Sequence, residues 1–339
     1  MSSEGLPATI EKRPGRLRRL WQAARLQLVL CLATLAVIEL ILQLFQPAYL
    51  KDKFWNSLHY HNDPELGWFP APNSNMSDDT ANFMRVRHNS LGLRDVEYER
   101  SPKPTILFVG DSLVWGYLVD EEVRFTNLVA AQLPGHTVVN AGISGYGTDQ
   151  EYLLLKRIWD HIKPDVVVLV VCVDNDRADN TRNVRYNNFK PYFEMTADGE
   201  GQFRGQPVPK SRPLYFTQNW LFEHVWLARL AAAAYVELRH PRVTVPDPTE
   251  KLVGMMRDLI EERGANFLVG LQHQEAPLEA FLQRENIPYT TFDGAKLLSD
   301  NVHWAAEGHI LVAERTMKLL SDAGMLREGL RSFPSVARP

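Results

Sequence analysis

One apolar stretch near the N-terminus most limits what this chain of 339 residues can fold into. Residues 26–45 read LQLVLCLATLAVIELILQLF and contain a single ionisable group, Glu39. About 20 apolar residues in a helix are enough to cross the roughly 30 Å hydrocarbon layer of a membrane. The stretch therefore predicts a transmembrane helix, and it confines the globular part of the protein to the residues that follow.

The charges before this stretch predict its orientation. Residues 1–25 contain two acidic and six basic side chains, the latter being Lys12, Arg13, Arg16, Arg18, Arg19 and Arg25. The positive-inside rule places this basic tail in the cytoplasm and everything after Pro47 on the other side of the membrane, which is the periplasm in a Gram-negative cell. A cleavable signal peptide is the alternative, but its apolar core is shorter, about 7–15 residues, and ends in small residues. We therefore favour an uncleaved signal anchor at 26–45.

Two polar residues lie one helical turn apart inside the apolar stretch, Glu39 and Gln43. An acidic group at the centre of a membrane helix costs about 2.5–3.5 kcal/mol on insertion scales. Glu39 could be protonated or could reach the membrane surface. Alternatively, the two side chains form a polar stripe that contacts a partner membrane helix.

The overall composition excludes some classes of function. Lys and Arg number 37 against 41 Asp and Glu, which gives a net charge of −4 and no support for a nucleic-acid-binding protein. The two cysteines, Cys31 and Cys172, lie in apolar surroundings, so we expect neither a disulfide framework nor a cysteine metal site. We expect no cofactor.

Beyond residue 104 the pattern alternates between short apolar runs and helical stretches. Such alternation is typical of βαβ units, and it predicts an α/β domain with a parallel sheet and helices on both faces. The expected strands are 105–109, 138–140, 165–171, 266–270 and 289–292. The expected helices are about 121–133, 149–162, 248–263, 276–285 and 305–322.

These elements divide the chain into segments. Residues 46–103 are rich in turn residues, and they are interpreted as an irregular stalk and lead-in to a domain at 104–325, which residues 326–339 follow as a tail. An insertion at about 176–246 interrupts the domain, and it contains a possible hairpin around Asp198-Gly199 and a helix at 220–238. The insertion begins at the carboxyl end of a central strand, at the edge where open α/β sheets bind ligands. We therefore expect the insertion to serve as a lid or binding loop.

The first expected strand runs directly into Gly110-Asp111-Ser112-Leu113. A serine on a tight turn at the end of a buried strand is placed to act as a nucleophile, and it needs a base within hydrogen-bonding distance. The best candidate is His303, because Asp300 lies three residues earlier on the same loop and can fix the imidazole tautomer. The flanking residues are not G-x-S-x-G, which excludes the nucleophile elbow of α/β-hydrolases.

Two further residues follow neighbouring strands. Gly142 offers a backbone N–H after the second strand, and Asn175 offers a side-chain amide after the third. Together with the Ser112 N–H they would supply three donors to a developing oxyanion. Gly142 could also be a simple turn glycine, which is compatible with that role.

In this order, Gly110-Asp111-Ser112-Leu113, Gly142, Asn175-Asp176 and Asp300-x-x-His303 resemble the four sequence blocks of the SGNH (GDSL) hydrolase family. The resemblance implies a flavodoxin-like three-layer sandwich with a five-stranded parallel sheet. It also implies Ser112 as nucleophile, Gly142 and Asn175 as oxyanion donors, His303 as base and Asp300 as its orienting partner. The third block departs from the family pattern, with Val173 in place of glycine. The segment 89–94 is similar to membrane-anchored bacterial members that have envelope or exopolysaccharide functions.

The expected function is therefore a serine esterase that forms an acyl-Ser112 intermediate, with O-acyl groups on a glycan as the expected substrate. An O-acyltransferase would use the same residues, and a non-catalytic glycan-binding or scaffold domain is a further alternative. The aromatic residues of the insertion could stack on sugar rings or could anchor the insertion; these are Tyr186, Phe189, Tyr192 and Phe193. His309 has no partners at metal-binding spacing, so we expect a structural histidine.

Overall fold

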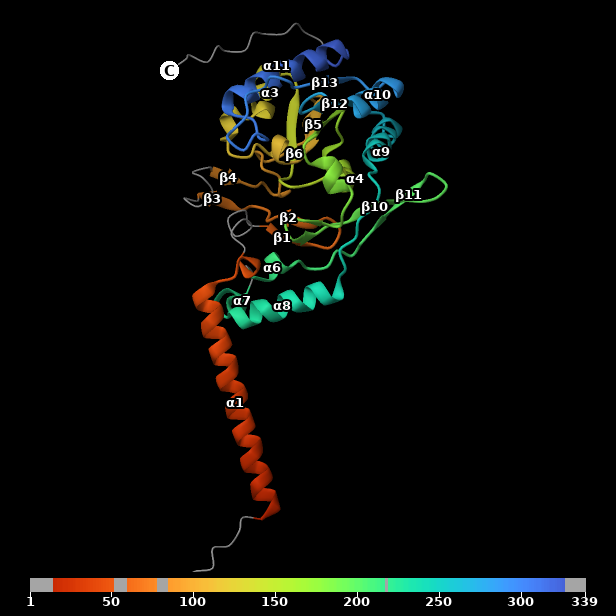
Figure 1. Cartoon of the computed structure of the whole chain (residues 1–339). Helices are drawn as coiled ribbons and strands as arrows, with labels where there is room; N and C mark the ends of the chain where they lie inside the picture. Colours follow the sequence, from red (N-terminus) through yellow and green to blue (C-terminus); the bar gives the residue numbers. More distant parts are fainter. Residues whose placement is uncertain (1–14, 52–59, 78–84, 217–218, 327–339) are drawn as a thin grey trace, which may run out of the picture.

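The computed structural model describes residues 15–51, 60–77, 85–216 and 219–326. A five-stranded parallel sheet forms the centre of the domain, in the order β13-β12-β7-β5-β6 (Figure 1). Its strands are β5 (Thr105–Gly110), β6 (Thr137–Gly142), β7 (Val166–Val171), β12 (Asn266–Leu271) and β13 (Tyr289–Thr291). The predicted α/β class and five-stranded parallel sheet are confirmed.

Successive strand residues point to opposite faces of the sheet and build two separate cores. Leu107 and Val109 of β5 pack with α4 (Thr148–Ile162), α9 (Thr249–Glu262) and α10 (Ala276–Arg284). Ile106 and Phe108 pack on the other face with α3 (Phe125–Gln132) and α11 (Ala306–Asp322). Because the central strands β5 and β7 are buried on both faces, they read as nearly continuous apolar runs in the sequence.

The helix predicted at 121–133 begins later than expected. Glu121–Val123 forms the short 3₁₀ helix η2, and α3 starts only at Phe125. The backbone between them is extended at Arg124, whose side chain is fully buried. The predicted helix is therefore interrupted at Arg124, a buried charged residue whose burial the local sequence does not reveal.

In the segment 46–103, the described residues 46–51, 60–77 and 85–103 include regular elements, so the expectation of an irregular segment was wrong for them. After the 3₁₀ helix η1 (Ala48–Leu50), the segment forms two antiparallel hairpins. They are β1 (Tyr60–Asp63) with β2 (Gly67–Pro70), and β3 (Asn75–Ser77) with β4 (Arg85–Arg87). Leu66, Trp68 and Leu93 are fully buried in the same core as α4. The strands are three or four residues long, which is too short for alternation to reveal them among the turn residues.

The insertion contains the predicted hairpin, as β10 (Tyr192–Met195) and β11 (Gly201–Arg204). It also holds α5 (Asp176–Asn180), β8 (Val184–Arg185), β9 (Asn188–Phe189) and α6 (Arg212–Phe216). The helix predicted at 220–238 is broken at Val225 into α7 (Trp220–His224) and α8 (Trp226–Arg239). At the break, the first two backbone N–H groups of α8, from Trp226 and Leu227, donate hydrogen bonds to the side chain of Glu39.

The predicted apolar helix lies within α1 (Arg16–Phe45), which extends away from the domain as one long element (Figure 1). Among the described residues, α1 is the one helix long and apolar enough to cross a membrane, and its most apolar window is entirely unburied. In Figure 1, α8 lies crosswise to α1, between α1 and the rest of the domain.

Candidate active site

The nucleophile candidate Ser112 begins α2 (Ser112–Trp115), immediately after β5. Asp111 caps this helix, because its side chain accepts a hydrogen bond from the Leu113 N–H at 2.8 Å. Gly110 is required at the turn, since a Cβ there would lie 2.9 Å from the carbonyl oxygen of Val170. Strand, glycine and cap together fix the serine at the carboxyl edge of the sheet.

His303 and Asp300 lie on the loop between β13 and α11, and the structure brings both to Ser112. His303 Nε2 is 2.8 Å from Ser112 Oγ, and His303 Nδ1 is 2.6 Å from Asp300 Oδ2. Asp300 Oδ1 also accepts the backbone N–H groups of Val302 and His303, each at 3.0 Å. The chain Ser112–His303–Asp300 therefore has the geometry of a nucleophile, a base and an orienting carboxylate.

The charge on Asp300 is stabilised by its surroundings. Partial burial opposes ionisation, but the backbone N–H of Val302 and the His303 side chain outweigh it and hold the pKa of Asp300 below its ordinary value. An ionised Asp300 favours the tautomer of His303 that carries its proton on Nδ1. Nε2 is then free to accept the proton of Ser112.

Asn175 reaches the same site after β7. Its Nδ2 donates to Asp111 Oδ2 at 3.2 Å, and the Ser112 hydroxyl lies at the same distance from that oxygen. Val173, which stands where the family pattern has glycine, does not adopt a positive φ. A side chain is therefore tolerated there, and Asn175 still lies beside Ser112.

Gly142 lies at the end of β6, but its N–H is already engaged. It donates to Asn140 Oδ1 at 3.0 Å, and a Cβ at this glycine would lie 2.2 Å from the Trp115 nitrogen. Gly142 thus allows α2 to approach β6 closely. Its role as an oxyanion donor stays a prediction, and that role requires the hydrogen bond to Asn140 to open.

Sequence reasoning missed a second glycine in the turn after β6. Gly145 has φ of 82° and is buried beside Trp68 and Tyr186. The Ile143 N–H donates to Gly110, and the Ser144 N–H donates to the Tyr60 hydroxyl. Within the part of the chain that the structure describes, the Gly145 N–H has no acceptor. The glycine-rich pattern of this turn was the available signal, although it does not indicate which N–H is free.

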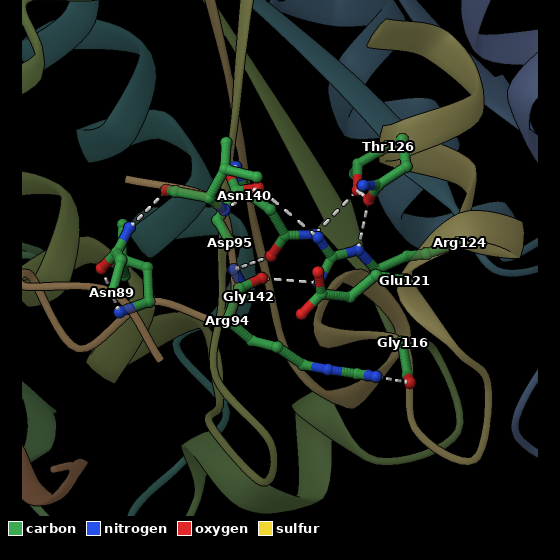
Figure 2. Close-up of polar contacts among 12 residues, drawn as sticks. Asn89, Arg94, Asp95, Gly116, Glu121, Arg124, Thr126, Asn140 and Gly142 are labelled. Atoms are coloured by element: carbon green, nitrogen blue, oxygen red, sulfur yellow. Dashed lines mark hydrogen bonds and ion pairs between the residues drawn. The ribbon is translucent and has the colours of Figure 1, made fainter. Parts of the chain in front are cut away.

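A buried polar network connects Arg94, Asp95 and Arg124 with Gly116, the residue that follows α2, and with Asn140 of β6 (Figure 2). Arg94 donates to the carbonyl of Trp115 at 3.0 Å and to that of Val119 at 2.8 Å. Arg124 donates to the Arg94 carbonyl at 2.6 Å and lies 3.6 Å from Asp95. Asp95 and the two arginines are buried, so loss of one charge would leave others uncompensated. This network joins the segment before β5 to the active-site turn.

Several acidic side chains lie buried near the site. Burial, followed by the charges of Asp111 and Asp149, raises the pKa of Glu151 well above its ordinary value. Burial, followed by the charges of Glu151 and Asp111, does the same for Asp176. For both carboxyl groups, burial and the neighbouring negative charges oppose ionisation.

His309 has a structural role, as expected. It is buried, and its Nδ1 accepts the backbone N–H of Phe125 at 3.2 Å. Burial, assisted by Arg124 and Arg94, lowers the pKa of His309 to about 3, so the ring is neutral. Among the described residues, no group of three or more metal-ligating side chains occurs.

The aromatic residues of the insertion divide into two groups. Phe189 and Phe193 are buried and anchor the insertion, whereas Tyr186 is 46% exposed and lies against Gly145. Tyr117, which was not predicted, has its ring centroid 4.5 Å from that of His303. One tyrosine therefore lies beside the base and another beside the glycine turn.

Residues 108–309 match the model of the GDSL-like lipase/acylhydrolase family. The chain belongs to this family. It is a hydrolase that acts on ester bonds, as the sequence resemblance implied. No curated protein matches the chain.

Among solved structures, the chain is similar to a member of the lipolytic G-D-S-L family from Veillonella parvula. The two share 13% sequence identity with a TM-score of 0.39, and the match covers 64% of this chain and 98% of the other. It is also similar to a carbohydrate acetylesterase from Sinorhizobium meliloti, at 14% identity and a TM-score of 0.36, covering 66% and 100%. A psychrotrophic esterase from a Pseudoalteromonas species gives 11% identity and a TM-score of 0.37, covering 66% and 100%.

Proposed function

We propose that this GDSL hydrolase cleaves O-acyl esters through a covalent acyl-Ser112 intermediate. His303 Nε2 takes the Ser112 proton as Oγ attacks the ester carbonyl, and it returns that proton to the departing alkoxide as the C–O bond breaks. Water then attacks the acyl-serine with His303 again as base, which releases the carboxylic acid and restores Ser112. The observation that carries this proposal is the Oγ–Nε2 distance of 2.8 Å, with Asp300 on the other ring nitrogen.

The proposal assigns the developing oxyanion to the Ser112 N–H, the Asn175 amide and one N–H from the turn after β6. Gly145 is the better candidate in that turn, since its N–H has no acceptor among the described residues, whereas the Gly142 N–H is bonded to Asn140. Preorganised donors of this kind are each worth roughly 10²–10³ in rate.

The proposed substrate is an O-acylated glycan. Tyr117 and Tyr186 support it, because one lies beside His303 and the other beside Gly145, and aromatic rings pack well on amphipathic ligands. The insertion supplies Tyr186, and a long insertion at this edge of the sheet is a typical place for substrate contacts.

Hydrolysis of a short-chain aryl ester and of an acetylated oligosaccharide by the full chain tests this function. We expect turnover of both, a higher kcat/KM for the oligosaccharide, and an acyl adduct on Ser112 in the mass spectrum of quenched enzyme. Transfer of the acyl group to an added glycan, in place of water, would identify an O-acyltransferase. Absence of turnover and of an adduct with either ester would leave only a binding function.

The proposed location of the hydrolase is outside the cytoplasm, attached through residues 26–45. The basic residues before this segment and the length of α1 support that orientation. A reporter enzyme that is active only outside the cytoplasm, fused after Pro339, should be active. A cytoplasm-specific reporter that is active at the same position would contradict the orientation.

A further inference from the structure

The outward face of α8 is apolar along its length. Leu230, Ala234 and Leu238 succeed one another at intervals of four residues and are all exposed, Leu238 at 86%. Ala231 and Tyr235 flank this row and are also exposed. A helix on the surface of a globular protein normally presents polar residues to water. The outward face of α8 does the opposite.

The other face of α8 is apolar as well, and it packs against the domain. Trp226 and Ala233 are buried in a cluster with Leu50 and Phe216. Val236 is buried in a neighbouring cluster with residues of the insertion. The helix is thus apolar on both sides, and the domain covers only one of them. Its charged side chains are Arg229, Glu237 and Arg239, so the row of exposed apolar residues is a distinct surface, of the kind that marks contact with a membrane or a protein.

The apolar surface extends beyond α8. Outside α1, six of the nine exposed large apolar side chains in the described part of the chain lie on α7 and α8 or directly after α1; the other three are Val96, Tyr186 and Leu297. Trp220 and Leu221 of α7 are 67% and 46% exposed, and Tyr49 is 47% exposed. The surface is therefore continuous with the end of the apolar helix α1, which is not expected of unrelated exposed residues.

Polar contacts fix α8 to α1 at a defined level. The Glu39 carboxylate accepts the first two backbone N–H groups of α8, from Trp226 at 3.0 Å and from Leu227 at 2.7 Å. Gln43 donates to the His224 carbonyl at 2.8 Å and also to Glu39. Glu39 therefore caps α8 across the chain, as an N-cap side chain usually does within one helix.

These contacts set the depth of α8 relative to the apolar helix. Glu39 precedes the end of α1 at Phe45 by six residues, which corresponds to about 9 Å at 1.5 Å per residue. If α1 crosses a bilayer, α8 begins close to the boundary between head groups and acyl chains. Amphipathic interfacial helices lie about 5–10 Å into that boundary.

We propose that α7 and α8 form an interfacial helix pair, which rests on the outer surface of the bilayer that α1 crosses, with Leu230, Ala234 and Leu238 in contact with acyl chains. The inference rests on the proposed membrane anchoring. The occupant of the apolar face is lipid, because the face is continuous with α1 and is held at the level of the end of α1. Arg239, whose guanidinium lies 5.7 Å from the Tyr235 ring centroid, can extend to the head groups. The domain is then attached to the membrane both by α1 and by the helix pair α7 and α8.

The test uses the full chain reconstituted into phosphatidylcholine vesicles. Cys31 is changed to serine, and single cysteines that carry a nitroxide label are introduced by Leu230→Cys, Ala234→Cys or Leu238→Cys; the native Cys172 is buried and stays. Leu32→Cys within α1 reports the bilayer interior, and Lys318→Cys on α11 reports water. Relaxation by oxygen, which dissolves in lipid, and by a water-soluble nickel complex is measured at each site.

We expect the oxygen-to-nickel accessibility ratio at residues 230, 234 and 238 to exceed that at residue 318 by about fivefold or more, as at an interfacial depth. A ratio at these three sites equal to that at residue 318, with residue 32 shielded from nickel, would overturn the proposal and leave the anchor intact. Access of nickel to residue 32 would overturn the anchor as well. Shielding of the three sites from both reagents would overturn the proposal in favour of a protein contact.

Discussion

Asp300 and Glu39 lie in different parts of the molecule and make similar sets of hydrogen bonds. Asp300 accepts two backbone N–H groups and the His303 imidazole, and Glu39 accepts two backbone N–H groups and the Gln43 amide. The partners of Asp300 lie within three residues of it, whereas the backbone partners of Glu39 are 187 and 188 residues away. A carboxylate with local partners can thus be interpreted from sequence, and one with distant partners cannot.

The largest predicted effect is the loss of activity when Ser112, His303 or Asp300 is replaced. Ser112→Ala and His303→Ala should each lower kcat/KM for an aryl ester by about 10⁴–10⁶, and combining them should add little, because the residues act as one unit. Asp300→Ala should cost less, about 10³–10⁴, because His303 can still adopt the required tautomer. Steady-state kinetics of the single and double variants measure this. Losses that multiply would contradict a catalytic triad.

Asn175→Ala should give the next largest effect. Removal of one proposed oxyanion donor should lower kcat by about 10²–10³ and change KM little, because the contact forms mainly in the transition state. Asn266→Ala, at the exposed start of β12, is the matched control and should retain parental kinetics. An Asn175→Ala enzyme with an unchanged kcat would exclude the amide from the oxyanion site.

Glu39→Leu should destabilise the start of α8 without changing ester hydrolysis, whereas replacement of Asp300 should lower hydrolysis. Glu39→Leu leaves the N–H groups of Trp226 and Leu227 without their acceptor, and loss of a helix cap costs about 1 kcal/mol. Amide hydrogen exchange at the start of α8 should therefore accelerate about fivefold, since 1.4 kcal/mol corresponds to a factor of ten. Hydrolysis of a small soluble ester should not change. Glu223→Gln on α7 is the control, and equal exchange in both variants would contradict the capping role.

The smallest effect concerns the hairpin β1–β2. Arg157 of α4 donates to Asp63 at 2.7 Å. Burial opposes ionisation of Asp63, but Arg157 and the Leu66 N–H outweigh it and hold the pKa of Asp63 below its ordinary value of 3.8. Because the pKa is lower in the folded chain, the stabilisation is complete above the ordinary value and is lost as pH falls through the folded value.

Asp63→Asn should therefore lower the free energy of unfolding by about 1–3 kcal/mol at neutral pH, and the difference from the parent should shrink below about pH 4. Urea unfolding in detergent at several pH values measures it, with Asp160→Asn on the exposed side of α4 as control. A difference that is constant with pH would show that the ion pair does not contribute.

The sheet and the proximity of Ser112, His303 and Asp300 could be predicted because their signals are local. The run Val166–Val171 is apolar throughout since both faces of β7 are buried, and Ser112 follows directly after β5. Asp300 and His303 are neighbours on one loop. Each of these features depends on a few consecutive residues and on the rule that parallel strands bring their carboxyl ends to one edge.

Other features depend on contacts that adjacent residues do not reveal. Trp68 is buried because α4 covers it, and the Gly142 N–H is occupied because the Asn140 side chain turns back on it. The polar stripe at Glu39 and Gln43 suggested a partner membrane helix. In the structure, Glu39 accepts the first backbone N–H groups of α8, and Gln43 donates to the carbonyl of His224, the last residue of α7. These partners are 181 to 188 residues apart in the sequence, so no local pattern predicts that they are in contact.

The separation of Ser112 from His303 by 191 residues has a consequence for biosynthesis. The ribosome makes Ser112 first and His303 only 191 residues later. A nascent chain that ends between these two residues therefore contains the serine without the histidine that lies beside it in the fold. If Ser112 and His303 act as proposed, esterase activity begins only when the loop that carries His303 has been made and folded.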